Sequence, residues 1–177
     1  MAVAEKLTIE DFEKLPPELA YYHELEDGQL IDVSGNTLKH IEVRDYLAAL
    51  MLLYVRQHQL GLVVAEQEYR FGENAHGPDI SFMGPEKMAR REMDRRVQPF
   101  APDLAIEVVS NNETFTSIVR KAHRYLKHGT QEVWVFHIPS REVYFYSTEG
   151  KRILDDHEMF ETPLIPGFRM PLGELFG

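Results

Sequence analysis

The sequence predicts an α/β fold in which helices flank a central mixed β-sheet. Short apolar runs rich in β-branched residues, such as residues 104–109, are typical of strands that are buried on both faces. Between such runs lie segments with helical periodicity, of which residues 37–59 and 114–127 are the longest. No repeat, linker or low-complexity segment divides the 177 residues, and a chain of this length can bury the core of one domain. We therefore expect a single domain over residues 1–177.

The N-terminal segment predicts a short helix followed by a β-hairpin. Thr8 precedes an acidic turn and is a suitable helix N-cap, and Pro16-Pro17 is expected to stop this helix. Asp27-Gly28 lies between two short apolar stretches, which is a common hairpin signal. The hairpin is therefore expected to turn at these two residues.

A long helix follows, with Ser34 or Thr37 as its N-cap, and it continues through Gln59 until Gly61 ends it. Its second half, residues 48–55, is apolar nearly all round. Such a segment is either deeply buried or placed at a subunit interface. Because of this apolar segment, we expect a homodimer.

The remainder of the chain is predicted to alternate strands, helices and loops. Strands are expected at residues 62–71, 79–83, 104–109, 132–137 and 142–147, helices at 114–127 and 172–176, a helix with a loop at 85–98, and loops at 72–78 and 162–168. Gly129 is the expected residue just past the end of the helix at 114–127.

Composition limits the chemistry that the protein can perform. The chain has no cysteine, so a metal must be held by oxygen or imidazole ligands. The N-terminus has no leader-like pattern and no apolar run is long enough to span a membrane, so we expect a cytoplasmic protein without a membrane partner. The net charge of −10 argues against tight, non-specific nucleic-acid binding, although it does not exclude a nuclease.

Positive charge is concentrated in two segments. Residues 114–131 contain no acid, and their basic residues include Arg120, Arg124 and Lys127. Residues 86–96 are also rich in Lys and Arg, although acids are interspersed among them. Each segment is equally consistent with a phosphate-facing patch and with a solvated helix face.

Two strands carry carboxylates that suggest a metal site. Glu107 lies inside an apolar run, where a glutamate is seldom buried without a positive partner, and Asp79 begins a second predicted strand. If the two strands are neighbours, both side chains can reach one cation, with the Val108 carbonyl as a third protein ligand. Hard ions such as Mg²⁺ or Mn²⁺ prefer such oxygen donors. The alternatives are a buried salt bridge for Glu107 and a turn or cap for Asp79.

Three further residues are candidates for the same site. Lys121 lies beside Tyr125 at the edge of a helical apolar stripe, so it can bury its stem and bring its ammonium group to the carboxylates. Glu24, next to the predicted hairpin turn, can add a carboxylate, and His40 can act as a ligand or a phosphate contact. The alternatives are an exposed lysine, an exposed hairpin charge and an ordinary helix histidine.

The order and spacing of several segments resemble the Uma2 family of restriction endonuclease-like proteins. The segments that carry the resemblance are Tyr22–Leu30, His40, Pro78–Ile80, Ala101–Ser110, Lys121 with Tyr125, Gly129–Val135 and Pro163–Phe168. The resemblance implies the fold of the PD-(D/E)xK nucleases, which is a restriction endonuclease-like core with an acidic pair on adjacent strands. It therefore implies a metal-dependent endonuclease that hydrolyses phosphodiester bonds, with DNA as the expected substrate and Mg²⁺ or Mn²⁺ as the cofactor.

The resemblance also assigns roles to individual residues. Asp79 matches the first acid and Glu107 the second, and Lys121 matches a lysine that has migrated to the following helix. Val109 occupies the position where the superfamily usually has that lysine. Glu24 matches an extra acid of the family, and His40 is an accessory candidate.

Two positions depart from the family pattern. Asn111 replaces a frequent proline after Ser110, which should alter only a loop. Ser117 replaces an aspartate four residues before Lys121 and removes a carboxylate that would orient this lysine. The alternative function is a catalytically inactive module that acts in dimerisation or protein interaction, which the acidic net charge, Val109 in place of lysine and the apolar segment 48–55 support.

Overall fold

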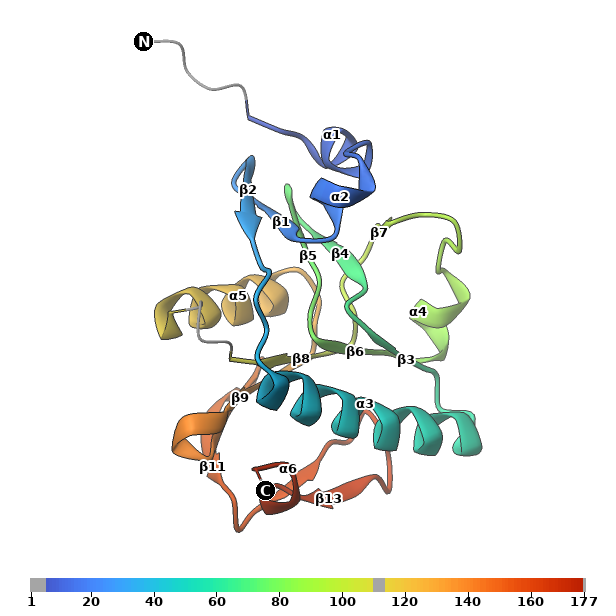
Figure 1. Cartoon of the computed structure of the whole chain (residues 1–177). Helices are drawn as coiled ribbons and strands as arrows, with labels where there is room; N and C mark the ends of the chain where they lie inside the picture. The colour runs from blue at the N-terminus through green and yellow to red at the C-terminus, as the bar shows by residue number, and fades with distance from the viewer. Residues whose placement is uncertain (1–5, 110–113, 177) are drawn as a thin grey trace.

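In the computed structural model, which describes residues 6–109 and 114–176, two β-sheets and a small C-terminal ribbon are connected by helices (Figure 1). The larger sheet has the strand order β11-β10-β9-β8-β6-β3. Its strands are β3 (Leu62–Ala65), β6 (Ile80–Met83), β8 (Leu104–Val108), β9 (Glu132–His137), β10 (Glu142–Ser147) and β11 (Gly150–Asp155). Strands β8 and β9 are parallel and the other pairs are antiparallel, so this is the expected mixed sheet.

The second sheet has the order β2-β1-β5-β4-β7. Its strands are β1 (His23–Glu26), β2 (Gln29–Asp32), β4 (Glu68–Phe71), β5 (Asn74–His76) and β7 (Val97–Gln98). Strands β1 and β2 form the predicted hairpin, in which Asp27 and Gly28 both have positive φ angles (51° and 83°) as a tight two-residue turn requires.

The helices lie around and between these sheets. They are α1 (Ile9–Glu13), α2 (Pro17–Ala20), α3 (Leu38–His58), α4 (Pro85–Ala89), α5 (Phe115–Lys127), the 3₁₀ turn η1 (Ile138–Ser140) and α6 (Gly173–Phe176). In Figure 1, α3 crosses the molecule below β3, β6 and β8, and β13 and α6 lie beneath it. No helix in the described part of the chain is long and apolar enough to cross a membrane.

The two faces of β8 pack against different helices, and this alternation positions the candidate site. Leu104, Ile106 and Val108 belong to the core cluster that contains the buried face of α3. Ala105 belongs to the cluster formed with α5. Because side chains alternate along a strand, Glu107 is directed to the α5 side of the sheet.

The structure corrects the prediction of one continuous strand over residues 62–71. Strand β3 ends at Ala65, and the chain resumes as β4 in the other sheet. Glu66 between them has a positive φ angle of 54°, a conformation that breaks the extended backbone. The residue types of this segment do not reveal such a break, because glutamate does not usually adopt this conformation.

Other boundaries also differ from the prediction. Residues 74–76, expected in a loop, form β5. Strands β12 (Met159–Glu161) and β13 (Arg169–Pro171), for which no strand was predicted, pair on either side of the expected loop at 162–168. Pro17 begins α2 instead of only ending α1, since proline suits the first position of a helix. Short strands and helices of this kind are stabilised by tertiary pairing and leave little local signal.

The long helix confirms the Thr37 N-cap, whose side chain accepts a hydrogen bond from the His40 amide. It ends at Gln59 in the left-handed conformation, two residues before the glycine that was expected to end it. Its second half is not buried all round. Met51 and Val55 lie in the core, but Leu53 is 64% exposed and Leu52 is 41% exposed.

Candidate active site

Asp79 and Glu107 come together across two neighbouring strands, as expected. Strands β6 and β8 are antiparallel with Ile80 opposite Ile106, so continuing this register by one position places Asp79 opposite Glu107. Both side chains are nearly inaccessible to solvent. The site therefore begins with two buried carboxylates at one end of the β6–β8 pair, where the two sheets meet.

Each oxygen of Asp79 has a hydrogen-bond partner. Oδ1 lies 2.9 Å from Nε2 of His40, on the first turn of α3, and Oδ2 accepts a 2.7 Å hydrogen bond from the Val108 amide. An ionised carboxylate can only accept, so His40 donates from Nε2. Its buried Nδ1 has no hydrogen-bond partner among the described residues. His40 thus fixes the orientation of Asp79, and the Val108 backbone lies within the site.

Lys121 reaches the carboxylates from α5. Its side chain is only 11% exposed, and Nζ lies 2.9 Å from Oε2 of Glu24 and 3.9 Å from Oε1 of Glu107. The structure therefore places this lysine between the hairpin carboxylate and the strand carboxylate. This arrangement matches the expectation of a buried stem with its ammonium group at the acidic cluster.

Tyr125, one helical turn after Lys121, holds Glu107 in place. Its hydroxyl donates a 2.6 Å hydrogen bond to Oε1 of Glu107. The Tyr125 ring is buried and stacks on Phe71 with a centroid distance of 4.2 Å. A fixed ring and a short hydrogen bond leave Glu107 with a defined orientation.

Glu24 has a dense set of partners. Besides Lys121, Oε2 lies 3.0 Å from Nδ1 of His76, and Oε1 accepts a 3.0 Å hydrogen bond from the Gly77 amide. Burial alone would raise the pKa of Glu24, but the charge of Lys121 and the hydrogen bonds from His76 and Lys121 lower this pKa to about 2. Glu24 is therefore an ionised counterion for Lys121 at neutral pH.

Sequence reasoning missed His76, which connects the site to the β1–β2 hairpin. Nε2 of His76 lies 2.8 Å from the Arg124 guanidinium, which can only donate, so this nitrogen accepts and Nδ1 donates to Glu24. Arg124 also lies 3.0 Å from Glu26. His76 lies in β5, which has three residues. A segment this short is easily interpreted as a loop from its sequence.

The basic residues proposed for nucleic-acid contact differ in accessibility. Arg124 is 13% exposed and is held by Glu26 and His76. Arg120 is 59% exposed and also pairs with Glu26 at 3.0 Å, and Lys127 lies at the surface. Only Arg120 and Lys127 therefore present their charge to solvent.

The second basic segment is largely occupied by intramolecular ion pairs. Lys87 lies 2.9 Å from Asp103, Arg95 lies 3.0 Å from Glu13, and Arg96 lies 2.6 Å from Glu68. These ion pairs link α4 and the segment before β7 to the rest of the protein. The three basic residues therefore have a structural role.

Of the two departures from the family pattern, one can be placed. Ser117 lies on the first turn of α5, where its amide and hydroxyl both bond to Thr114. Its side chain thus belongs to the helix cap. Ser110 and Asn111 lie outside the described residues.

The donor set suits a hard divalent ion. Among the described residues, no three His, Asp or Glu side chains are grouped so as to hold a metal ion by themselves. Mg²⁺ and Mn²⁺ nevertheless bind through one or two carboxylates together with water and substrate phosphates. The Asp79–Glu107 pair and the adjacent Val108 backbone fit that requirement.

Comparison with known proteins identifies the family of this chain. A family model described as Uma2, "Putative restriction endonuclease", matches residues 9–173. The chain belongs to the Uma2 family. The structure brings together Asp79, Glu107 and Lys121, the three residues to which the sequence resemblance assigned catalytic roles.

A solved structure supports the fold. The chain is similar to a putative nuclease belonging to DUF820 from Anabaena variabilis ATCC 29413, with a TM-score of 0.85 and 24% sequence identity. The alignment covers 96% of this chain and 97% of the other. No curated protein matches the sequence. The restriction endonuclease-like fold of the Uma2 protein is thereby confirmed.

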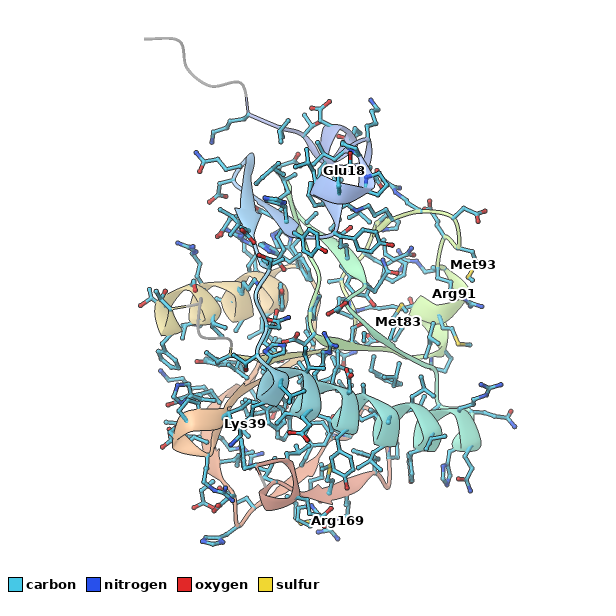
Figure 2. The ribbon with its side chains drawn as sticks, in the orientation of Figure 1. Glu18, Lys39, Met83, Arg91, Met93 and Arg169 are labelled. Atoms are coloured by element: carbon cyan, nitrogen blue, oxygen red, sulfur yellow. The ribbon has the colours of Figure 1, made fainter. Side chains whose placement is uncertain are left out.

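The ion pair between Glu24 and Lys121 predicts a stability effect. In Glu24→Gln, the free energy of unfolding at neutral pH should fall by about 3 kcal/mol, because the buried ammonium group loses its counterion. The matched control is Glu18→Gln, which changes an exposed glutamate of α2 (labelled in Figure 2) and should leave stability nearly unchanged. Urea unfolding of the two variants and the wild type measures this difference.

The lowered pKa of Glu24 predicts part of the loss of stability at acid pH. The pKa of Glu24 is lowered in the folded state from 4.5 to about 2, so its stabilising contribution is complete above the higher value and is lost as the pH falls through the lower one. The difference in free energy of unfolding between the wild type and Glu24→Gln should therefore decrease as the pH falls from 4.5 to about 2. Equal stability differences at about pH 7 and about pH 3 would contradict the assignment.

Proposed function

We propose that this Uma2 protein is a metal-dependent endonuclease that hydrolyses phosphodiester bonds in DNA. The observation that carries the proposal is the position of Lys121, whose Nζ lies 3.9 Å from Glu107 while Glu107 lies opposite Asp79 on the neighbouring strand. Two acids on adjacent strands with one ammonium group are the charge pattern that a phosphate-hydrolysing site requires. Family membership and the fold support the same activity class, whereas fold by itself does not establish function.

Asp79, Glu107 and the Val108 carbonyl are the proposed ligands of Mg²⁺ or Mn²⁺. When bound, such an ion lowers the pKa of a coordinated water and neutralises negative charge on the scissile phosphate. His40 and Tyr125 orient the two carboxylates through the 2.9 Å and 2.6 Å hydrogen bonds described above. These positioning contacts reduce the reorganisation needed when substrate binds.

Lys121 is proposed to stabilise negative charge on the phosphate or on the attacking hydroxide. Its ammonium group is largely withdrawn from water. The field of a charge is stronger in such a buried position than at the surface. Glu24, which the sequence suggested as an additional metal ligand, is in this arrangement the counterion that holds Lys121. A ligand role for Glu24 would require Lys121 to move.

DNA is proposed to approach along the exposed part of α5. Arg120 and Lys127 are accessible there and lie on the same helix as Lys121. Phosphate contacts by arginine and lysine are the main sequence-independent contribution to DNA affinity. Arg124, in contrast, is proposed to hold the β1–β2 hairpin, since its guanidinium is occupied by Glu26 and His76.

Metal binding can be tested without a nucleic-acid substrate. Millimolar Mn²⁺ or Ca²⁺ should raise the melting temperature by several degrees, because an ion that binds only the folded protein stabilises it. Asp79→Asn should abolish the increase while Glu18→Gln retains it. A melting temperature that does not respond to either ion in the wild type would contradict the metal site.

The second candidate function is a catalytically inactive module. The Lys121–Glu24 ion pair favours it, since an ammonium group that is paired with Glu24 at 2.9 Å is less available to a substrate phosphate. An inactive module should neither cleave DNA nor respond to divalent ions. A response to ions without cleavage would instead indicate a functional metal site with a different phosphate-ester substrate.

A further inference from the structure

One face of α3 is directed away from the core and carries an unusual number of apolar side chains. At about 100° per residue, the core-facing side is centred on His40, Val43, Leu47 and Met51. The opposite side carries Leu38, Tyr46, Ala49, Leu52 and Leu53. Leu38 is 76% exposed and Tyr46 is 46% exposed. We call this side of the helix the outer α3 face.

No element of the described chain covers the outer α3 face. In Figure 1, α3 lies in the foreground and no ribbon passes in front of it. Helix α6 packs beside the first half of α3. An apolar stripe that spans several helical turns is typical of an interaction surface, since scattered exposed apolar residues do not align in this way.

Charges at the two ends of the outer α3 face are of opposite sign. Glu42 lies in the first half and Arg56 in the last turn, and both are exposed. Neither forms an ion pair with another described residue. Ala49 lies midway, seven residues from each, which corresponds to about 10 Å along a helix on either side. Asp45, which is exposed and pairs with Arg44, also lies on this face near Glu42. The face therefore has an acidic end, an apolar middle and a basic end.

We propose that the outer α3 face is the interface with a second copy of this chain, with the two α3 helices antiparallel and crossing at Ala49. Antiparallel pairing about this point brings Glu42 of each copy level with Arg56 of the other. It also brings Tyr46 of each copy level with Leu52 of the other. The surface is thus complementary to itself, as a two-fold symmetric dimer requires. The small side chain of Ala49 permits close approach at the symmetry axis.

A groove beside this face provides a second reason for an identical partner. It has a volume of about 720 Å³ and is bordered by Leu38, Glu42 and Tyr46 of α3 and by Glu174, Leu175 and Phe176 of α6. Lys39, labelled in Figure 2 near the beginning of α3, also borders it. In the antiparallel arrangement, the last turn of the second α3 helix, with Arg56, lies over this groove. The Arg56 guanidinium group then meets the acidic rim formed by Glu42 and Glu174.

Charge reversal provides a direct test. Glu42→Arg and Arg56→Glu each turn two attractive contacts into two repulsive ones, so each variant alone should dimerise about tenfold more weakly than the wild type. A mixture of the two variants should form a heterodimer in which both contacts are attractive again. The double variant Glu42→Arg/Arg56→Glu should likewise dimerise as the wild type does. The control is Glu86→Arg, a charge reversal at an exposed position of α4.

Sedimentation velocity over a range of concentrations measures these affinities, and circular dichroism verifies that each variant is folded. Recovery of dimer in the mixture, with the single variants mainly monomeric, is the expected result. A wild type that stays monomeric up to about 1 mM would overturn the proposal, because even weak specific interfaces associate there. A dimer that is insensitive to these charges, or to Leu53→Glu, would also overturn it. Neither result depends on nuclease activity.

Discussion

Replacing Glu107 by alanine is expected to reduce the rate of DNA cleavage by on the order of 10³-fold or more. The carboxylate lies opposite Asp79 and accepts a hydrogen bond from Tyr125, so it is held in one orientation at the proposed metal position. Its removal leaves the ion with fewer protein ligands and leaves Lys121 without its second acidic neighbour. Single-turnover cleavage of a labelled DNA duplex in saturating Mn²⁺ measures the rate.

The control for this experiment is Glu149→Ala, which removes an exposed glutamate from the turn before β11. It should cleave at the wild-type rate. Retention of wild-type activity by Glu107→Ala would remove this residue from the active site. Comparison of melting temperatures distinguishes loss of chemistry from loss of folded protein.

The second large effect concerns the charge of Lys121. Lys121→Met should reduce cleavage by about 10²-fold or more, because a buried ammonium group that stabilises the developing negative charge is lost. The variant should also be less stable, since Glu24 keeps its charge in a buried position without its closest counterion. Lys151→Met, at an exposed position of β11, is the matched control.

A double variant separates these two consequences. Glu24→Gln/Lys121→Met removes both charges of the pair, so it should be more stable than either single variant. Its cleavage rate should nevertheless stay as low as that of Lys121→Met. If the double variant regained activity together with stability, Lys121 would be a structural residue that takes no part in the chemistry.

The sequence contained enough information to predict the strand carboxylates and their neighbourhood. A glutamate inside an apolar β-branched run is informative because burial there requires a specific partner, and Glu107 indeed has Tyr125 and Lys121 beside it. Helical spacing also placed Lys121 at the edge of the apolar stripe of α5. These predictions depend on local periodicity, which a single sequence records directly.

The contacts of Glu24 and His76 depended on tertiary structure instead. Glu24 lies on a hairpin of one sheet, whereas Glu107 lies on the other sheet. No local pattern reports how two sheets meet. For the same reason the 2.8 Å contact between His76 and Arg124 could not be predicted, and Arg124 was expected to face DNA.

Sequence periodicity was also insufficient to predict the environment of the apolar second half of α3. An apolar helix segment predicts either burial or an interface, and the two cannot be distinguished from periodicity. The structure resolves this by burying Met51 and Val55 while leaving Leu53 at the surface. The charge order along that face then indicates which partner fits it.

The most direct test of the proposed activity is the conversion of supercoiled plasmid to nicked circles by the purified protein in Mg²⁺ or Mn²⁺. The proposal predicts nicking that requires the metal, stops when a chelator is added, and is lost in Glu107→Ala. Intact plasmid under all metal conditions, with folded protein and no metal-induced change in melting temperature, would contradict the nuclease assignment.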